Sequence, residues 1–161
     1  MKKRVVSWGL GVLHDIRQLI ESARGRVSQY ANTELTILYW KVGDRIRREV
    51  LKEKRAEYGQ EILPTLSARL VIDYGSGFSV PNLSRMVRFS ECFYDERILS
   101  TLSKELSWSH FIEIIPLEDP LKREFYAEMC RMERWSVRTL RKRIASMMFE
   151  RTAIAKKPEI I

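Results

Sequence analysis

Cysteine and histidine are scarce in this sequence. The 161 residues include two cysteines, Cys92 and Cys130, and two histidines, His14 and His110. These four residues are spread along the chain, so they form neither a disulfide framework nor the closely spaced pairs of a zinc site. We therefore predict buried, reduced cysteines and expect neither a metal nor a cofactor.

Long apolar runs are also lacking. No stretch approaches the roughly 20 apolar residues that a membrane-spanning helix needs. The first 13 residues begin like a signal peptide, but their apolar part is short, contains glycine and runs into His14 and Asp15. We expect a cytoplasmic protein that does not cross a membrane.

The residue patterns of common catalytic sites are missing as well. The segment Gly75–Gly77 lacks the lysine and the preceding strand of a phosphate-binding loop. Metal-dependent cleavage of a phosphodiester could use two carboxylates and a lysine, here Glu118, Asp119 and Lys122. These residues fall in a loop-to-helix stretch, whereas restriction-type nucleases carry theirs on strands. His110 has no acid placed to complete a hydrolase triad. We expect no catalytic residue in this chain.

Basic residues, in contrast, are abundant and unevenly distributed. The chain has 29 lysines and arginines against 21 acids, a net charge of +8. Residues 1–58 hold 13 basic and 7 acidic side chains, residues 59–130 hold 7 and 11, and residues 131–161 hold 9 and 3. Clustered positive charge favours a polyanionic partner, so nucleic acid is the expected ligand class.

The spacing of apolar residues predicts helices almost throughout. From residue 13 to 50 they recur at steps of three and four. Gly25 and the stretch Tyr30–Thr33 are plausible breaks, so we expect two helices or one kinked helix there. Further helices are expected over 59–73, 79–95, 96–105, 107–115, 119–132 and 136–151.

These elements predict a compact all-α domain with a long N-terminal helical hairpin or kinked helix. Its expected boundaries are an N-terminal extension at 1–12, the helical domain at 13–152 and a linker or truncated tail at 153–161.

One motif opens three of the helices. A large apolar residue is followed by serine, and a second apolar residue comes four positions after the serine. The three copies are Phe78-Ser-Val-Pro-Asn-Leu83, Leu106-Ser-Trp-Ser-His-Phe111 and Trp135-Ser-Val-Arg-Thr-Leu140. The serine suits an N-cap, and the two apolar residues suit a hydrophobic staple.

Two surfaces are candidate nucleic-acid sites. Residues 60–94 read as helix, glycine turn and capped helix, which is the order of a helix-turn-helix. An ordinary helical hairpin fits this segment equally well. The second surface is the last helix, where few acids offset the arginines, although such a face can also be merely solvated. The predicted contact residues are Asn82, Ser84, Arg85, Arg88, Arg134, Arg138, Arg141 and Lys142.

The three serine motifs, with Gly75–Met86 and Phe125-Tyr126, resemble the N-terminal domain of a bacterial family, the YhcG-like proteins, over roughly residues 12–152. The resemblance implies a helical N-terminal domain that precedes a PD-(D/E)xK nuclease domain acting in DNA metabolism or mobile-element defence. The family's motif positions correspond here to Phe78, Ser79, Asn82, Leu83, Arg85, Leu106, Ser107, Trp108, Ser109, His110, Trp135, Ser136 and Arg138.

This sequence ends at Ile161, where the family continues into the nuclease domain, so its catalytic carboxylates and lysine have no counterpart here. Either a trimmed or a naturally short chain fits that ending. We expect a DNA-binding module that is not an enzyme by itself and that delivers a downstream nuclease domain. The alternative is an assembly module, in which the 13–50 helices pair with a second copy or another protein.

Overall fold

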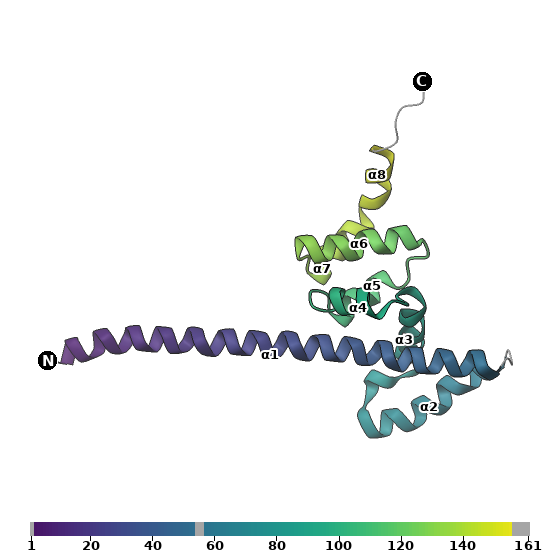
Figure 1. The fold of residues 1–161 in the computed structure, drawn as a ribbon, viewed down its shortest axis with the longest axis horizontal. Coiled ribbons are helices and arrows are strands. Elements are labelled where there is room, and N and C mark those ends of the chain that lie inside the picture. The colour runs from purple at the N-terminus through teal and green to yellow at the C-terminus, as the bar shows by residue number, and fades with distance from the viewer. Residues whose placement is uncertain (1, 54–56, 156–161) are drawn as a thin grey trace.

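The computed structural model describes residues 2–53 and 57–155, and all regular structure within these ranges is helical (Figure 1). The predicted all-α class is therefore confirmed. In chain order the elements are α1 (Lys2–Glu53), α2 (Tyr58–Tyr74), the 3₁₀ turn η1 (Ser76–Phe78), α3 (Val80–Cys92), α4 (Glu96–Leu102), α5 (Trp108–Ile114), α6 (Pro120–Glu133), α7 (Val137–Ala145) and α8 (Met148–Ala155).

The longest element, α1, is one uninterrupted helix of 52 residues. The predicted breaks at Gly25 and Tyr30–Thr33 are wrong. A glycine costs a helix only about 1 kcal/mol relative to alanine, which neighbouring helix-forming residues offset. The residues expected as an N-terminal extension form the first turns of this helix, and α1 projects far beyond the other helices (Figure 1).

The polar stretch that suggested a break is instead a docking site for another part of the chain. Three α1 side chains, those of Gln29, Asn32 and Thr33, donate hydrogen bonds to backbone carbonyls at the end of α4 and in the turn after it. Their acceptors are the carbonyl oxygens of Lys104, Leu106 and Ser103, at 3.0, 3.3 and 2.9 Å respectively. These carbonyls follow Leu102, the last residue of α4, so the three contacts fix the turn after α4 against α1.

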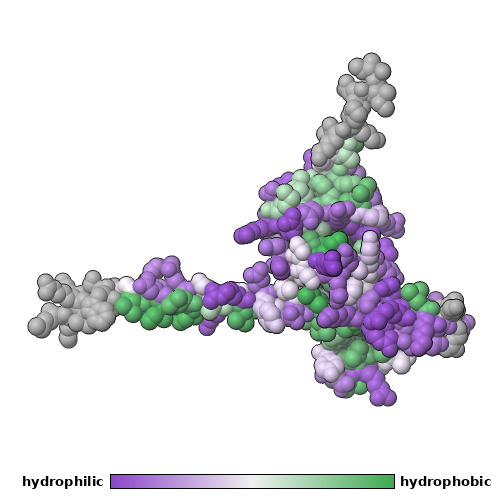
Figure 2. Space-filling view, in the orientation of Figure 1, coloured by the Kyte–Doolittle hydropathy of each residue, from purple (hydrophilic) through white to green (hydrophobic). Residues whose placement is uncertain are grey.

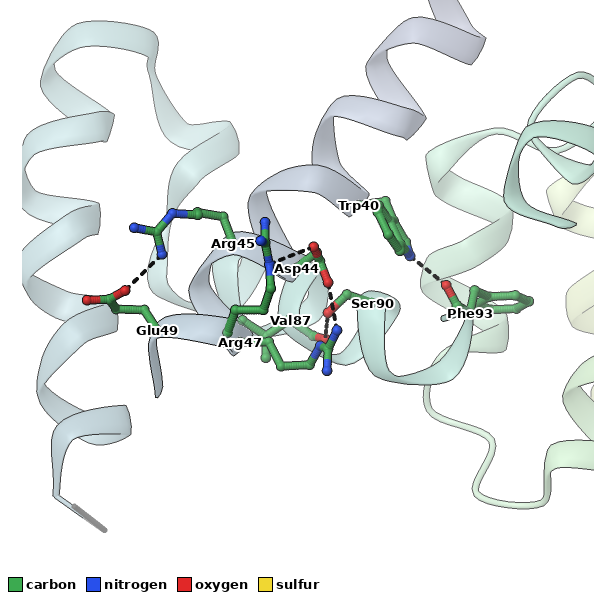
Figure 3. A network of polar contacts seen from close by, with 9 residues as sticks. Trp40, Asp44, Arg45, Arg47, Glu49, Val87, Ser90 and Phe93 are labelled. Carbon is green, nitrogen blue, oxygen red and sulfur yellow. Dashed lines mark hydrogen bonds and ion pairs between the residues drawn. The ribbon is translucent and has the colours of Figure 1, made fainter. Parts of the chain in front are cut away.

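Further along, α1 and α3 come into backbone contact. A methyl group added to Gly43 would lie 1.8 Å from the carbonyl oxygen of Met86 and 2.2 Å from its carbonyl carbon. Next to this crossing, the indole N–H of Trp40 donates to the carbonyl oxygen of Phe93 at 2.6 Å, just past the end of α3 (Figure 3). Glycine at position 43 therefore sets the distance between the two helices.

Two apolar clusters form the interior, one on each side of this crossing. One contains Met86 and Leu83 of α3 with Ile46 of α1, and α2 covers it. The other gathers residues of α4 to α7 around Phe111, and Phe89 of α3 joins it. Partly buried Trp108 packs against both clusters, with its ring 5.0 Å from that of Tyr39 and 5.3 Å from that of Phe89. The two clusters are therefore continuous through aromatic contacts.

The predicted helix 136–151 is in fact two helices, α7 and α8. Met147 lies between them in the left-handed region, with φ of 58°. The buried hydroxyl of Tyr126 donates to the carbonyl of Arg143 at 3.3 Å and accepts the N–H of Phe149 at 3.1 Å. Backbone groups freed by the break thus find a partner on α6, a long-range contact that helical periodicity does not encode.

Within the predicted tail at 153–161, residues 153–155 belong to α8, and residues 156–161 lie outside the described part of the chain. Although α1 is long, neither it nor another helix in the described part has an apolar stretch able to span a bilayer.

Alanine substitutions at two glycines of α1 should have opposite effects. Gly43→Ala forces α1 and α3 apart and should lower the free energy of unfolding by roughly 3 kcal/mol or more, measured by urea denaturation. Gly25 has no atom within 4 Å of an added methyl group, so Gly25→Ala should only favour the helix locally. We expect amide hydrogen exchange around residue 25 to slow about two- to fivefold. Equal destabilisation by both variants would contradict the close crossing.

Candidate nucleic-acid interface

The predicted contact residues of α3 lie on its outer face. Leu83, Met86 and Phe89 are fully buried, whereas Ser84, Arg85 and Arg88 are exposed and Asn82 is half-buried. The two arginines already have partners on their own helix. Arg85 donates to the side-chain oxygen of Asn82 at 2.7 Å, and Arg88 pairs with the carboxylate of Glu91 at 3.3 Å. Both pairs are exposed, so a phosphate could replace these partners at little cost.

The predicted contact residues of the last helix gather on the outer face of α7. Arg138, Arg141 and Lys142 are exposed, and Arg138 and Lys142 lie on the side opposite the fully buried Leu140. Arg141 pairs with Glu113 of α5 at 2.7 Å. Arg138 and Lys142 form no ion pair with any residue that the structure describes.

Arg134 stands at the entrance to α7. It ends α6 in the left-handed conformation, with φ of 52°, two residues before the serine that caps α7. Its side chain is exposed and, among the described residues, forms no ion pair. Arg134, Arg138 and Lys142 are thus three exposed cations at the start of α7 and along it that form no ion pair with a described residue, and we call them the α7 basic face.

The structure does not bring all eight predicted residues into one cluster. α3 packs mainly against α1 and α2, whereas α7 packs against α5, α6 and α8 (Figure 1). The polypeptide between the two helices, from α4 to α6, forms much of the interior. The two candidate surfaces therefore belong to different helix layers of one domain.

The three serine motifs position both surfaces, and each predicted N-cap is confirmed. Ser79 accepts the N–H of residue 82, Ser107 that of residue 110 and Ser136 that of residue 139. The apolar residue four positions after each serine is fully buried. Each motif thus begins a helix and anchors it in the core, which fixes the direction in which the helix presents its polar face.

His110 connects two of these motifs. Its Nδ1 accepts the backbone N–H of Ser107 at 3.0 Å, and its Nε2 lies 2.7 Å from the carbonyl oxygen of Trp135. Because an amide N–H only donates and a carbonyl only accepts, these contacts assign the proton to Nε2. His110 thus completes a capping box with Ser107 at the start of α5. The imidazole also holds the residue before Ser136, and hence the start of α7, against α5.

Two of the three residues weighed for metal-dependent cleavage, Asp119 and Lys122, have other partners. Asp119 caps α6 by accepting the N–H of Leu121 at 3.0 Å. Lys122 pairs with Glu150 at 2.6 Å, and this hydrogen bond lowers the pKa of the Glu150 carboxyl below its usual value. In the described part of the chain, no three His, Cys, Asp or Glu side chains form a group able to hold a metal ion.

The cysteines are free thiols, as expected. Cys130 is buried, and burial raises the pKa of its thiol to about 12. Cys92 is half-buried, and loss of solvent likewise raises the pKa of its thiol. Both are therefore held in the protonated form and suit packing better than nucleophilic chemistry.

The fold and its exposed arginines define an all-helical domain with a basic surface. A family model described as the DUF1016 N-terminal domain matches residues 15–151, so the chain belongs to this family. It is 29% identical over 178 residues to a protein of Escherichia coli (strain K12) named "Putative nuclease YhcG". That match covers 91% of this chain and 48% of the relative, so the chain spans about half the relative's length. The resemblance to YhcG-like proteins is thereby confirmed. No solved structure matches.

Replacing His110 should loosen the start of α7. His110→Ala leaves the Ser107 amide and the Trp135 carbonyl without their partner, so we expect a loss of about 2–4 kcal/mol in unfolding free energy. The neighbouring Ser109 is exposed. Ser109→Ala on the same turn should change the stability by less than about 0.5 kcal/mol. Thermal unfolding of the two variants measures the difference, and equal stability would contradict the bridging role.

Proposed function

We propose that this chain is a DNA-binding module that positions a nuclease domain of the full-length protein on its substrate. The observation that carries the proposal is the α7 basic face. Its three cations, Arg134, Arg138 and Lys142, are exposed and unpaired among the described residues, so binding to phosphates requires no ion pair to break.

The mechanical support of α7 favours the same function. Its inner face is anchored by Leu140, and its first turn is held by Ser136 and, through Trp135, by His110. The guanidinium of Arg143 lies over the Trp135 ring, 5.6 Å from its centroid. A rigidly held helix loses little conformational entropy when its outer face binds, so the arginines can contact phosphates at fixed spacing.

The α2–α3 pair supplies a second, weaker contact in this proposal. α3 follows α2 through Gly75 and η1, and its outer face carries Ser84, Arg85 and Arg88. The ion pair of Arg88 with Glu91 must open before that arginine binds a phosphate. We therefore assign the larger part of the affinity to the α7 basic face and a helix-turn-helix contact to α3.

We assign a binding role, without catalysis, to this chain. Asp119 and Lys122, the strongest carboxylate and lysine candidates, already cap α6 and tie it to α8. The nuclease link comes from the relative named "Putative nuclease YhcG", of which the match covers 48%. Incubated alone with duplex DNA and Mg²⁺ or Mn²⁺, the chain should leave the DNA uncut. Cleavage that depends on the metal would contradict this role.

Three double variants, each removing two positive charges, test the binding surface. We expect Arg138→Ala/Lys142→Ala to weaken duplex binding roughly 10- to 100-fold at moderate salt and to lower the slope of log affinity against log salt by about two. Arg85→Ala/Arg88→Ala should have a smaller effect. Fluorescence anisotropy with labelled duplex measures all three.

The control is Arg97→Ala/Lys104→Ala, which removes two exposed cations of α4 and the turn after it, outside both surfaces. It should change the affinity less than about threefold, since the net charge alone contributes little at moderate salt. An equal loss of DNA affinity in all three variants would mean that only the net charge matters, and it would contradict a specific binding surface. Failure of the unmodified chain to bind DNA at low salt would refute the proposal.

A further inference from the structure

The projecting part of α1 carries an apolar stripe that no described residue covers. Val12, Leu13, Ile16, Leu19, Ile20, Val27 and Tyr30 are each at least 40% exposed. Figure 2 shows this stripe as a continuous apolar band along one side of the projecting arm. Exposed apolar side chains gathered into one band, instead of scattered singly, mark an interaction surface.

The stripe faces away from α3 and from the α4 to α8 helices. Thr36 and Gly43 lie on the packed side, where Thr36 is fully buried and Gly43 meets α3. At about 100° of rotation per residue, they point about 160–180° around the helix from Ile16 and Val27. In Figure 2, drawn in the orientation of Figure 1, apolar residues accordingly lie along the side of the arm opposite the α4 to α8 helices. A partner helix could lie along the stripe without meeting those helices.

The spacing of the stripe is that of a coiled-coil seam. Its central positions alternate in steps of three and four, which places them at heptad positions a and d: Leu13, Ile16, Ile20, Ala23, Val27 and Tyr30. The next two a positions are Glu34 and Lys41, so the apolar seam stops before the region where α2 packs. Two paired arms would therefore separate there and leave room for both domains.

The flanking charges fit a second copy of the chain in parallel orientation. The e positions hold Arg17, Arg24 and Ala31, and the g positions hold Val12, Leu19 and Arg26. In a parallel pair each g residue faces the e residue five positions later on the other helix, so each arginine meets an apolar residue that its stem can cover. In an antiparallel pair e faces e, which would bring the arginines at 17 and 24 of both helices together.

We propose that α1 pairs with α1 of a second copy as a short parallel coiled coil over residues 12–31. This inference does not rest on DNA binding, because the seam lies on α1 and the proposed phosphate contacts lie on α3 and α7. Two and a half heptads bury few residues, so the dimer forms reversibly, at micromolar or higher protein concentration.

Sedimentation equilibrium over a range of concentrations tests the pairing. The mass should rise from 19.1 kDa toward about 38 kDa, twice the mass of the chain. Ile20→Glu places a charge in the seam and should weaken association at least about tenfold. Gln18→Glu adds the same charge on the opposite side of the helix and should leave association unchanged. Because Ile20 is exposed in the single chain, circular dichroism and thermal unfolding of the domain should match in both variants.

A chain that stays at 19.1 kDa at every concentration would overturn the proposal, as would equal dimerisation of the two variants.

The orientation of the two helices is tested by Leu13→Cys in a Cys92→Ser background. In the parallel pair position 13 faces its own counterpart, and mild oxidation should give a disulfide-linked dimer. Gln18→Cys in the same background should not cross-link. In an antiparallel pair the two copies of position 13 would lie about 25 Å apart, and a dimer that fails to cross-link would refute the parallel arrangement.

Discussion

The backbone contact between α1 and α3 at Gly43 and Met86 determines how the rest of the domain is arranged. A β-carbon at position 43 would overlap the α3 backbone, so the closeness of the two helices depends on this glycine. At this distance Leu83, Met86 and Phe89 of α3 become fully buried, and the Trp40 indole reaches the carbonyl of Phe93. α3 then separates two apolar clusters and contributes to both.

From this crossing, polar contacts place the remaining helices one after another. Gln29 and Thr33 of α1 hold the end of α4, and His110 of α5 holds the start of α7. Tyr126 of α6 binds backbone groups of both α7 and α8. Most of these contacts join a side chain to a backbone atom at a helix end, where carbonyls and amides have no helical partner. The orientation of α7, and with it the basic face, follows from this series.

Sequence patterns predicted what depends on neighbouring residues and failed where distant residues decide. The serine motifs located the starts of α3, α5 and α7, because an N-cap and its staple lie within six residues. The break at Met147 was missed because it depends on Tyr126, far away in the sequence. The expected break near Asn32 was wrong because that polar side chain binds the carbonyl of Leu106 and does not end the helix.

The candidate site was predictable to a similar degree. Amphipathic spacing identified which side chains of α7 would be exposed, and the structure shows Arg138 and Lys142 outside and Leu140 inside. It could not indicate that Arg141 would pair with Glu113 of α5, or that α3 and α7 would lie in separate layers. Ion pairs between helices and the positions of whole helices depend on tertiary packing, which single-helix periodicity does not contain.

We assign nucleic-acid contact to α7 and self-association to the projecting arm of α1, so the two proposed activities occupy different surfaces of one domain. Amide chemical-shift mapping by NMR during titration with a short DNA duplex at low salt tests this division most directly. We predict that the largest shifts fall on residues 134–142, with smaller shifts on α3 and none on the arm. Shifts concentrated on residues 12–31, with α7 unaffected, would contradict this assignment.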